Sequence, residues 1–279
     1  MEYNVSYLNI GKSIAIGANY MVNQQHLDLL KQDISAWNEW RGKHPEIHPE
    51  LRGANLSRLY LEGANLSQTN LEGANLIGAH LVGANLFKAN LKGAQLIEAY
   101  LEGANLNDAQ LERANFNMAQ LKKAQFIGSQ LNGAYLIEAE LKNTDFSRAH
   151  MEGARLIKAK LKGAKFIGTH LEGANLFEAH LEGAKLIDVH LEGASLKGSY
   201  LDRAELEKVT FGDKNNVGPW LADIHWGDTN LASVKWSQVE MLGEENEAWQ
   251  KERDGKVKDM VTRLDEYEVA LRTNRQLAS

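Results

Sequence analysis

The chain has 279 residues, no cysteine and a formal net charge of −6. Disulfide bonds and cysteine-based metal sites are therefore excluded. No run of 18 apolar residues occurs, and the N-terminus lacks the basic and apolar regions of a signal peptide. We therefore expect a cytoplasmic protein without a membrane-spanning helix.

The first 50 residues read as an N-terminal segment with a capping helix. Residues 1–19 predict either a short strand or an ordered tail. Residues 21–41 carry apolar side chains at helical spacing, which predicts one helix with Asn23 as its N-cap. We expect Trp37 and Trp40 on this helix to cover the open end of the next domain, and the alternative is that they dock a partner.

A strict five-residue pattern follows. A Leu, Phe or Met stands at every fifth position from Leu51 to Phe211, which makes 33 centres in phase, and a small residue, mostly Ala, stands two positions before each centre. A period of five fits neither an α-helix nor a flat strand, so the chain must turn a corner every five residues. With the centre called i, residues i and i−2 should point inward, while i−1, i+1 and i+2 point outward.

The corners predict two kinds of turn. At centres whose number ends in 1, position i+2 is usually Gly, which supplies the positive φ of a type II turn. At centres whose number ends in 6, that position often holds a charged residue, such as Lys88 or Glu98. These charged corners are expected to be type I or irregular.

The repeats resemble the A(D/N)LXX motif of the pentapeptide-repeat family, as in residues 64–68, which read Ala-Asn-Leu-Ser-Gln. The resemblance extends over residues 51–211. It implies an all-β solenoid, namely a right-handed quadrilateral β-helix with four pentapeptides in each coil. About eight to nine coils and a rod roughly 40 Å long are then expected. The N-terminal segment is similar to that of cyanobacterial members of the family.

The C-terminal region is expected to close the solenoid. After a loop, the five-residue phase resumes at Leu221, with larger centres such as Trp226 and Trp236 that suit a closing layer. A second capping helix with one apolar face follows, so α-helical caps are expected at both ends. The predicted domains are the N-terminal segment 1–50, the β-helix 51–211, the loop and closing coil 212–242, and the capping helix 243–279.

Outward positions are expected to carry any function, and residues 20 apart should stack on one face of the solenoid. Two opposite faces carry apolar side chains at position i+1, which indicates either favourable packing along a sheet or a protein interface. The candidate partner-binding stripes are Ile77, Ile97, Ile137, Ile157 and Phe177 on one face, and Phe87, Ile127, Ile167 and Ile187 on the other.

One column at position i−1 changes character along the rod. It begins with Asn70 and Asn90, for which amide ladders between coils are expected, and it later contains His150, His170 and His190. Three imidazoles one strand spacing apart are candidate metal ligands. They would point outward in parallel, however, and the column offers no nearby carboxylate. We therefore expect a solvated ladder and no metal site.

The charged residues of the repeats do not predict a nucleic-acid site. A basic belt surrounds one coil, whereas nucleic-acid binding needs cations on one face with aromatic residues between them. Residues 51–211 hold 18 acidic and 18 basic residues, so the net negative charge lies in the two ends. The belt consists of Arg155, Lys158, Lys160, Lys162 and Lys165.

No motif predicts catalysis. The chain has no P-loop, no G-x-S-x-G and no H-E-x-x-H, so no catalytic residues and no cofactor are expected. The favoured function is a non-enzymatic protein-binding or scaffold protein, with a homo-oligomer left open. The alternative that the resemblance permits is a DNA-mimicking protein that binds and protects a topoisomerase such as gyrase. Such mimicry needs a strongly acidic face, and the repeats are neutral overall.

Overall fold

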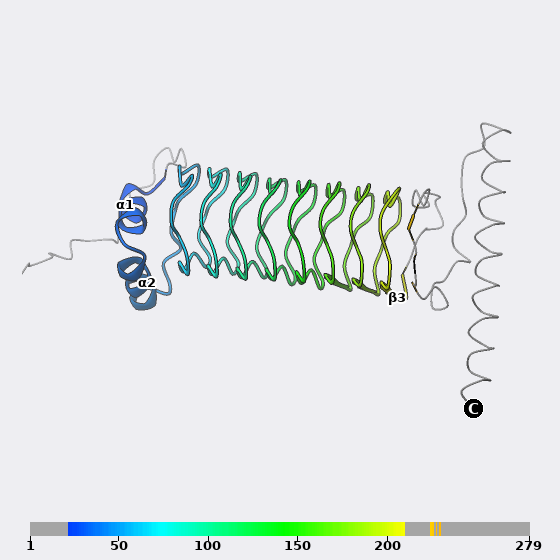
Figure 1. Cartoon of the computed structure of the whole chain (residues 1–279). Helices are drawn as coiled ribbons and strands as arrows, with labels where there is room; N and C mark the ends of the chain where they lie inside the picture. Colours follow the sequence, from blue (N-terminus) through cyan, green and yellow to red (C-terminus); the bar gives the residue numbers. More distant parts are fainter. Residues whose placement is uncertain (1–21, 210–223, 226, 228, 230–279) are drawn as a thin grey trace, which may run out of the picture.

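The structure, a computed structural model, describes residues 22–209 together with residues 224, 225, 227 and 229. Two helices lie at one end of a stack of coils, and three short strands lie toward its other end (Figure 1). No helix in these ranges is long and apolar enough to cross a membrane. The elements are α1 (Gln24–Gln32), α2 (Ile34–Lys43), β1 (Lys165–Ile167), β2 (Lys185–Ile187) and β3 (Glu205–Glu207).

Parallel pairing between residues 20 apart defines the coils. Isolated bridges run in four series that are offset from one another by five residues, beginning with Glu50↔Asn70, and β1, β2 and β3 continue one series as a parallel sheet. Each bridge is bonded in both directions, since Asn75 N–H donates to the Ala54 carbonyl at 2.9 Å and its own carbonyl accepts from Leu56 N–H at 2.8 Å. The register holds without an inserted residue from residue 50 to residue 207, so the chain forms a repeat β-helix.

The interior consists of the residues predicted to point inward. Every centre from Leu51 to Leu206 is buried, and so is every residue at i−2 from Ala54 to Val209 except Leu59, which is half-buried. Pairing one large and one small side chain at each corner fills a narrow interior without crowding. Larger rings also fit, because three phenylalanines stack at centroid distances of 5.0 and 5.3 Å, in the order Phe126, Phe146 and Phe166.

All described corners share one conformation, so the prediction of two turn types is wrong. Position i+2 has a positive φ throughout, 65° at Gly93 and 56° at Lys88. The charged corner closes as a β-turn, in which Ala89 N–H donates to the Leu86 carbonyl at 3.0 Å. A left-handed residue other than glycine costs about 1–2 kcal/mol. Stacking outweighs this cost, because the Lys88 N–H reaches the Asn107 carbonyl of the next coil at 3.0 Å.

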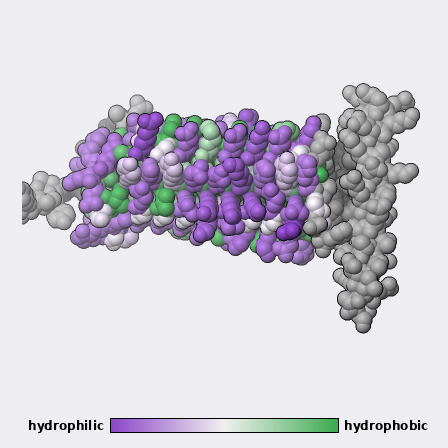
Figure 2. All heavy atoms as spheres, in the orientation of Figure 1, coloured by the Kyte–Doolittle hydropathy of each residue, from purple (hydrophilic) through white to green (hydrophobic). Residues whose placement is uncertain are grey.

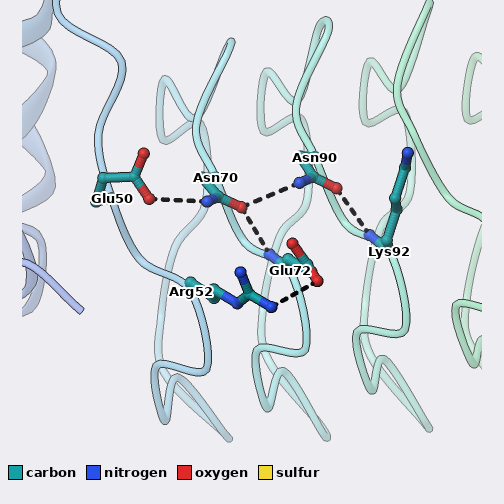
Figure 3. A network of polar contacts seen from close by, with 6 residues as sticks. All are labelled: Glu50, Arg52, Asn70, Glu72, Asn90 and Lys92. Atoms are coloured by element: carbon teal, nitrogen blue, oxygen red, sulfur yellow. Dashed lines mark hydrogen bonds and ion pairs between the residues drawn. The ribbon is translucent and has the colours of Figure 1, made fainter. Parts of the chain in front are cut away.

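Asparagine at position i−1 has two structural uses, which Figure 3 shows for one column. Its side-chain oxygen accepts the backbone N–H of residue i+1, as Asn70 does from Glu72 at 3.2 Å. Its amide group also bonds the coil before it, since Asn70 donates to Glu50 at 2.7 Å and Asn90 donates to Asn70 at 3.1 Å. The predicted amide ladder is therefore confirmed for Asn70 and Asn90, and it satisfies backbone donors that need a partner.

Two helices replace the single helix predicted for residues 21–41. Asn23 caps α1 as predicted, since its side chain accepts from the His26 N–H at 3.2 Å. Asp33 then ends α1 in an extended conformation, with φ −161°, and caps α2 by accepting from the Ser35 N–H at 2.8 Å. An aspartate side chain that bonds the following backbone N–H groups competes with the continuation of a helix, which explains the break.

Helix α2 packs against the first coils through buried side chains. Trp37 is fully buried in the core, and its indole N–H donates to the Asn65 carbonyl at 2.9 Å. The half-buried Trp40 ring lies 5.4 Å from the Trp37 ring. The buried Arg41 guanidinium donates to the Ser67 carbonyl at 2.8 Å. These contacts fix α2 on the end of the stack.

The stability of this end should fall on acidification because of His26. The buried ring accepts the Glu50 N–H at Nδ1, at 3.3 Å, and burial together with nearby Arg41 holds the His26 pKa below its usual 6.5. The unfolded chain then binds more protons than the folded one, so the free energy of unfolding is highest above the unfolded pKa and decreases as the pH falls through it.

Urea unfolding at about pH 7.5 and about pH 5.5 checks this prediction. We expect the wild type to lose stability at the lower pH, and His26→Gln to lose less. An equal loss in the two proteins would show that His26 does not carry the pH dependence.

The five-residue phase is found again at residues 225 and 229. Tyr200 pairs with His225, which is 25 residues later, and their rings stack at 4.4 Å. The hydroxyl of buried Thr229 donates to the Leu201 carbonyl. These positions agree with a phase that resumes at Leu221. The rest of the expected closing coil and the capping helix 243–279 lie outside the described residues.

Candidate functional site

The two apolar stripes lie on the outside of the coils but are mostly shielded. Eight of the nine side chains are half-buried, and only Ile167, at 38%, is exposed. Neighbours in a stripe, such as Ile137 and Ile157, occupy adjacent coils and cover one another. Polar residues also interrupt the stripes, since the Asn107 side chain accepts the Ile127 N–H at 2.8 Å.

The most exposed apolar side chains gather on a different face, in the N-terminal half of the stack. Tyr60 is 72% exposed, Met118 45%, Tyr100 44% and Val82 42%. The rings of Tyr60, His80 and Tyr100 stack between successive coils at 4.6 and 4.7 Å. Val82 stands two residues after His80. Met118 stands at the corner just before residue 120, which follows Tyr100 in the same column one coil later. We call these five residues the aromatic face.

The sequence prediction missed the aromatic face, because it looked for apolar side chains at position i+1. The signal lies at position i−1, where Tyr60 and Tyr100 stand 40 residues apart with His80 midway. The outer surface in view is largely hydrophilic, with hydrophobic residues in small separate patches (Figure 2). Among the large hydrophobic side chains that are exposed in the described part of the chain, Tyr60 and Tyr100 are the only aromatic ones.

The three histidines form a stacked ladder with carboxylates beside it. The rings of His150 and His170 stack at 4.8 Å and 3°, and those of His170 and His190 at 4.7 Å and 5°. Residues i−1 and i+1 flank an inward centre and point to the same side, so each imidazole Nδ1 meets a carboxylate oxygen of the neighbouring column. The distances are 3.2 Å to Glu152, 3.0 Å to Glu172 and 3.6 Å to Glu192.

These six residues, His150, His170, His190, Glu152, Glu172 and Glu192, are called the histidine ladder below. The sequence argument considered carboxylates only in the histidines' own column, and it therefore missed these three. The carboxylates come from the adjacent column, two residues later in the chain.

The basic belt does not form one basic face. Lys158 pairs with Glu178 at 3.5 Å, and Lys165 pairs with Asp145 at 3.5 Å. Lys160 pairs with Glu140 of the preceding coil, and the Arg155 guanidinium lies 5.0 Å from the centre of the Tyr135 ring. Acids in adjacent coils thus offset the cations of the belt, although exposed pairs of this kind add little stability.

The fold and the outer columns define a class of protein: a β-helix with one corner every five residues, leucine and alanine inside, and asparagine at i−1. Family sequence models agree with this class. Pentapeptide repeats match residues 54–93 and 174–213 in 8 copies, and a pentapeptide repeat region matches residues 104–176. The chain belongs to the pentapeptide-repeat family.

Solved structures of other repeat proteins are similar to the chain. HetL, a pentapeptide repeat protein involved in heterocyst differentiation regulation from the cyanobacterium Nostoc sp. strain PCC 7120, is 28% identical over 64% of this chain and 81% of its own, with a TM-score of 0.35. QnrB1, a plasmid-mediated fluoroquinolone resistance protein, is 20% identical over 67% and 93%, with a TM-score of 0.32.

A pentapeptide repeat protein from the Arabidopsis thaliana thylakoid lumen, AT2G44920, is 31% identical over 40% of this chain and 68% of its own, with a TM-score of 0.24. A comparison with curated proteins found no match. Because the TM-scores are this low, no partner or activity of these proteins is assigned to the chain.

Proposed function

We propose that the chain is a non-enzymatic protein-binding scaffold, in which a rigid β-helix presents the aromatic face to a protein partner. Among the described residues, four of the five most exposed large hydrophobic side chains lie on this one face, and this observation carries the proposal. Exposed aromatic residues commonly dominate protein interfaces. A preorganised rod also loses little conformational entropy when it binds.

The finer features of the fold belong to the same proposal. We propose a right-handed, quadrilateral β-helix of about eight to nine coils, closed by helices at both ends. The four series of bridges and the packing of α2 on the first coils support it. Closed ends would shield the unpaired edges of the terminal coils and leave the side faces for binding.

The apolar stripes are the second candidate surface for a partner or for another copy of the chain. Ile137, Ile157 and Phe177 leave part of each side chain accessible, and they occupy consecutive coils. Their mutual shielding favours a packing role, so the aromatic face is placed first.

The charge pattern does not favour the DNA-mimicking alternative. Mimicry of a nucleic acid needs an acidic run along one face. Here acids and bases are mixed along the outer columns, as in Lys92 with Glu112 at 3.1 Å and Lys122 with Glu102 at 3.5 Å. The acidic run of the histidine ladder is short, and each of its three carboxylates lies beside an imidazole. QnrB1, a fluoroquinolone resistance protein, shares the repeat at 20% identity, which indicates the fold alone.

Binding of variants to an identified partner tests the proposal. A partner captured from the native cell by cross-linking and mass spectrometry is purified and titrated against the wild type, Tyr60→Ser/Tyr100→Ser, and the stripe variant Ile137→Ser/Ile157→Ser/Phe177→Ser. We expect the tyrosine variant to bind at least roughly 30-fold more weakly, as the loss of a hot spot of about 2 kcal/mol requires.

Both variants should keep the wild-type melting temperature within a few degrees, because the replaced side chains lie outside the core. Wild-type affinity in the tyrosine variant would contradict the role of the aromatic face. Loss of binding in the stripe variant alone would show that the partner binds the apolar stripes. Gyrase captured as the partner, with protection from a fluoroquinolone in a supercoiling assay, would establish the alternative function.

A further inference from the structure

We propose that the histidine ladder binds a divalent cation of the zinc class. The proposal is independent of the aromatic face, since the two surfaces share no residue. It replaces the expectation of a metal-free ladder, because the carboxylates of the adjacent column supply the ligands that the histidine column lacks.

The ladder contains two sets of three potential ligands. In each set the ligand atoms of all three residues lie within 4.8 Å of one another. A histidine and a glutamate of one coil make up two members, and the third comes from the adjacent coil. The sets are His150, Glu152 and His170, and then Glu172, His190 and Glu192.

The separation of the paired ligand atoms suits a tetrahedral ion. Two ligands at 2.0–2.1 Å from zinc at a tetrahedral angle lie about 3.3 Å apart. The His150 Nδ1 and Glu152 oxygen are 3.2 Å apart, and the His190 Nδ1 and Glu192 oxygen are 3.6 Å apart. A zinc ion can therefore bind between the imidazole nitrogen and the carboxylate oxygen with small side-chain rotations. The third residue of each set approaches from an adjacent coil, and water completes the site.

Two carboxylate oxygens in the ladder also lack a compensating partner. One oxygen each of Glu172 and Glu192 is shielded from solvent and accepts no hydrogen bond. A shielded, unpaired carboxylate oxygen is unfavourable, and a bound cation would satisfy it. Both residues belong to the second set of ligands.

Imidazole and carboxylate together determine the class of ion. Imidazole nitrogen suits zinc, copper and nickel, whereas magnesium and calcium prefer sites made only of oxygen. Each set supplies three protein ligands and leaves one position open, which is the usual composition of an accessible zinc site. Zinc is the ion to test first.

The same rod contains a matched pair that lacks the third ligand. His180 Nδ1 lies 3.3 Å from Glu182, and one oxygen of Glu182 is also shielded and unpaired. In its own column, His180 has Lys160 on one side and Tyr200 on the other. A lysine repels a cation and tyrosine is a poor zinc ligand at neutral pH, so this pair should not bind zinc.

Calorimetric titration of the tag-free full chain with zinc chloride tests the proposal. The ladder variant is His150→Gln/His190→Gln, which removes one ligand from each set. The control is His80→Gln/His180→Gln, which removes the same number of histidines, each within 4 Å of a glutamate, from another face. We expect the wild type and the control to bind at least one zinc ion with affinities within about twofold, and the ladder variant to bind at least about tenfold more weakly.

A second readout separates binding from folding. Zinc should raise the melting temperature of the wild type and the control, but not that of the ladder variant, because an ion held between coils stabilises only the folded state. The proposal is overturned if the wild type binds no zinc, or if the ladder variant and the control lose binding to the same extent.

Discussion

Leu131→Asp should abolish the folded array. Leu131 is a fully buried centre in the middle of the stack, with the buried centres Leu111 and Met151 at the equivalent positions of the adjacent coils. A carboxylate placed there has no partner, and its burial costs several kcal/mol beyond the packing lost. Each coil contacts only its neighbours, so a defective middle coil divides the solenoid into two shorter stacks. We expect a melting temperature at least roughly 10 °C lower, or no folded protein.

The control places the same residue outside. Lys142→Asp changes an exposed side chain at position i+1 of the repeat centred on Leu141. It should leave the melting temperature within a few degrees of the wild type. Thermal unfolding followed by circular dichroism compares the three proteins. Equal melting temperatures for the wild type and Leu131→Asp would show that the centre residue does not point inward.

Trp37→Ala should detach α2 from the stack. The variant leaves a cavity in place of a fully buried indole and removes its hydrogen bond to the Asn65 carbonyl. Truncations of this kind typically cost about 3–5 kcal/mol. Because the loss is confined to one end, we expect hydrogen exchange to increase first in α2 and in the first coils, while amides near residue 131 stay protected.

Two further variants separate packing from the hydrogen bond. Trp40→Ala truncates a half-buried ring and should cost less than Trp37→Ala. Trp37→Phe keeps much of the buried volume but cannot donate to Asn65, so we expect an intermediate loss. The account of this end would be wrong if Trp40→Ala proved the more damaging change.

The interior of the fold was predictable from the sequence because the five-residue period allows only one inward pattern. The amide ladder at Asn70 and Asn90 was predictable for a related reason, namely that residues 20 apart meet in such a fold. Local preferences were less reliable. Lys88 favours a right-handed turn on its own, yet the stack imposes φ 56°, and only the hydrogen bonds between coils explain why.

The break between α1 and α2 was missed although a signal was present. Asp33 precedes Ile34 and Ser35, and an aspartate at such a point is a strong N-cap. The apolar spacing on both sides of it stays helical, so periodicity alone joined the two helices. A capping residue inside a helical pattern therefore carries information that the pattern does not.

The candidate sites were predictable only in part. The stripes follow from the period of 20, but their shielding depends on side chains in adjacent coils and required the structure. The pairing of His170 with Glu172 could have been read from the sequence, because His-Leu-Glu triplets place both polar residues on one side of an inward leucine. The two sets of three ligands could not have been read from the sequence, because they depend on distances between side chains in adjacent coils.

The amide ladder, the aromatic face and the histidine ladder all depend on residues 20 apart lying in adjacent coils. Distances between spin labels test this register directly, because the chain has no cysteine and labels can be placed at will. The pairs Val82→Cys/Lys162→Cys and Val82→Cys/Asp202→Cys use one outer column and span four and six coils. At about 4.8 Å per coil, the separations should be about 19 and about 29 Å, so 40 further residues add only about 10 Å. An increment of 20 Å or more would contradict the 20-residue coil.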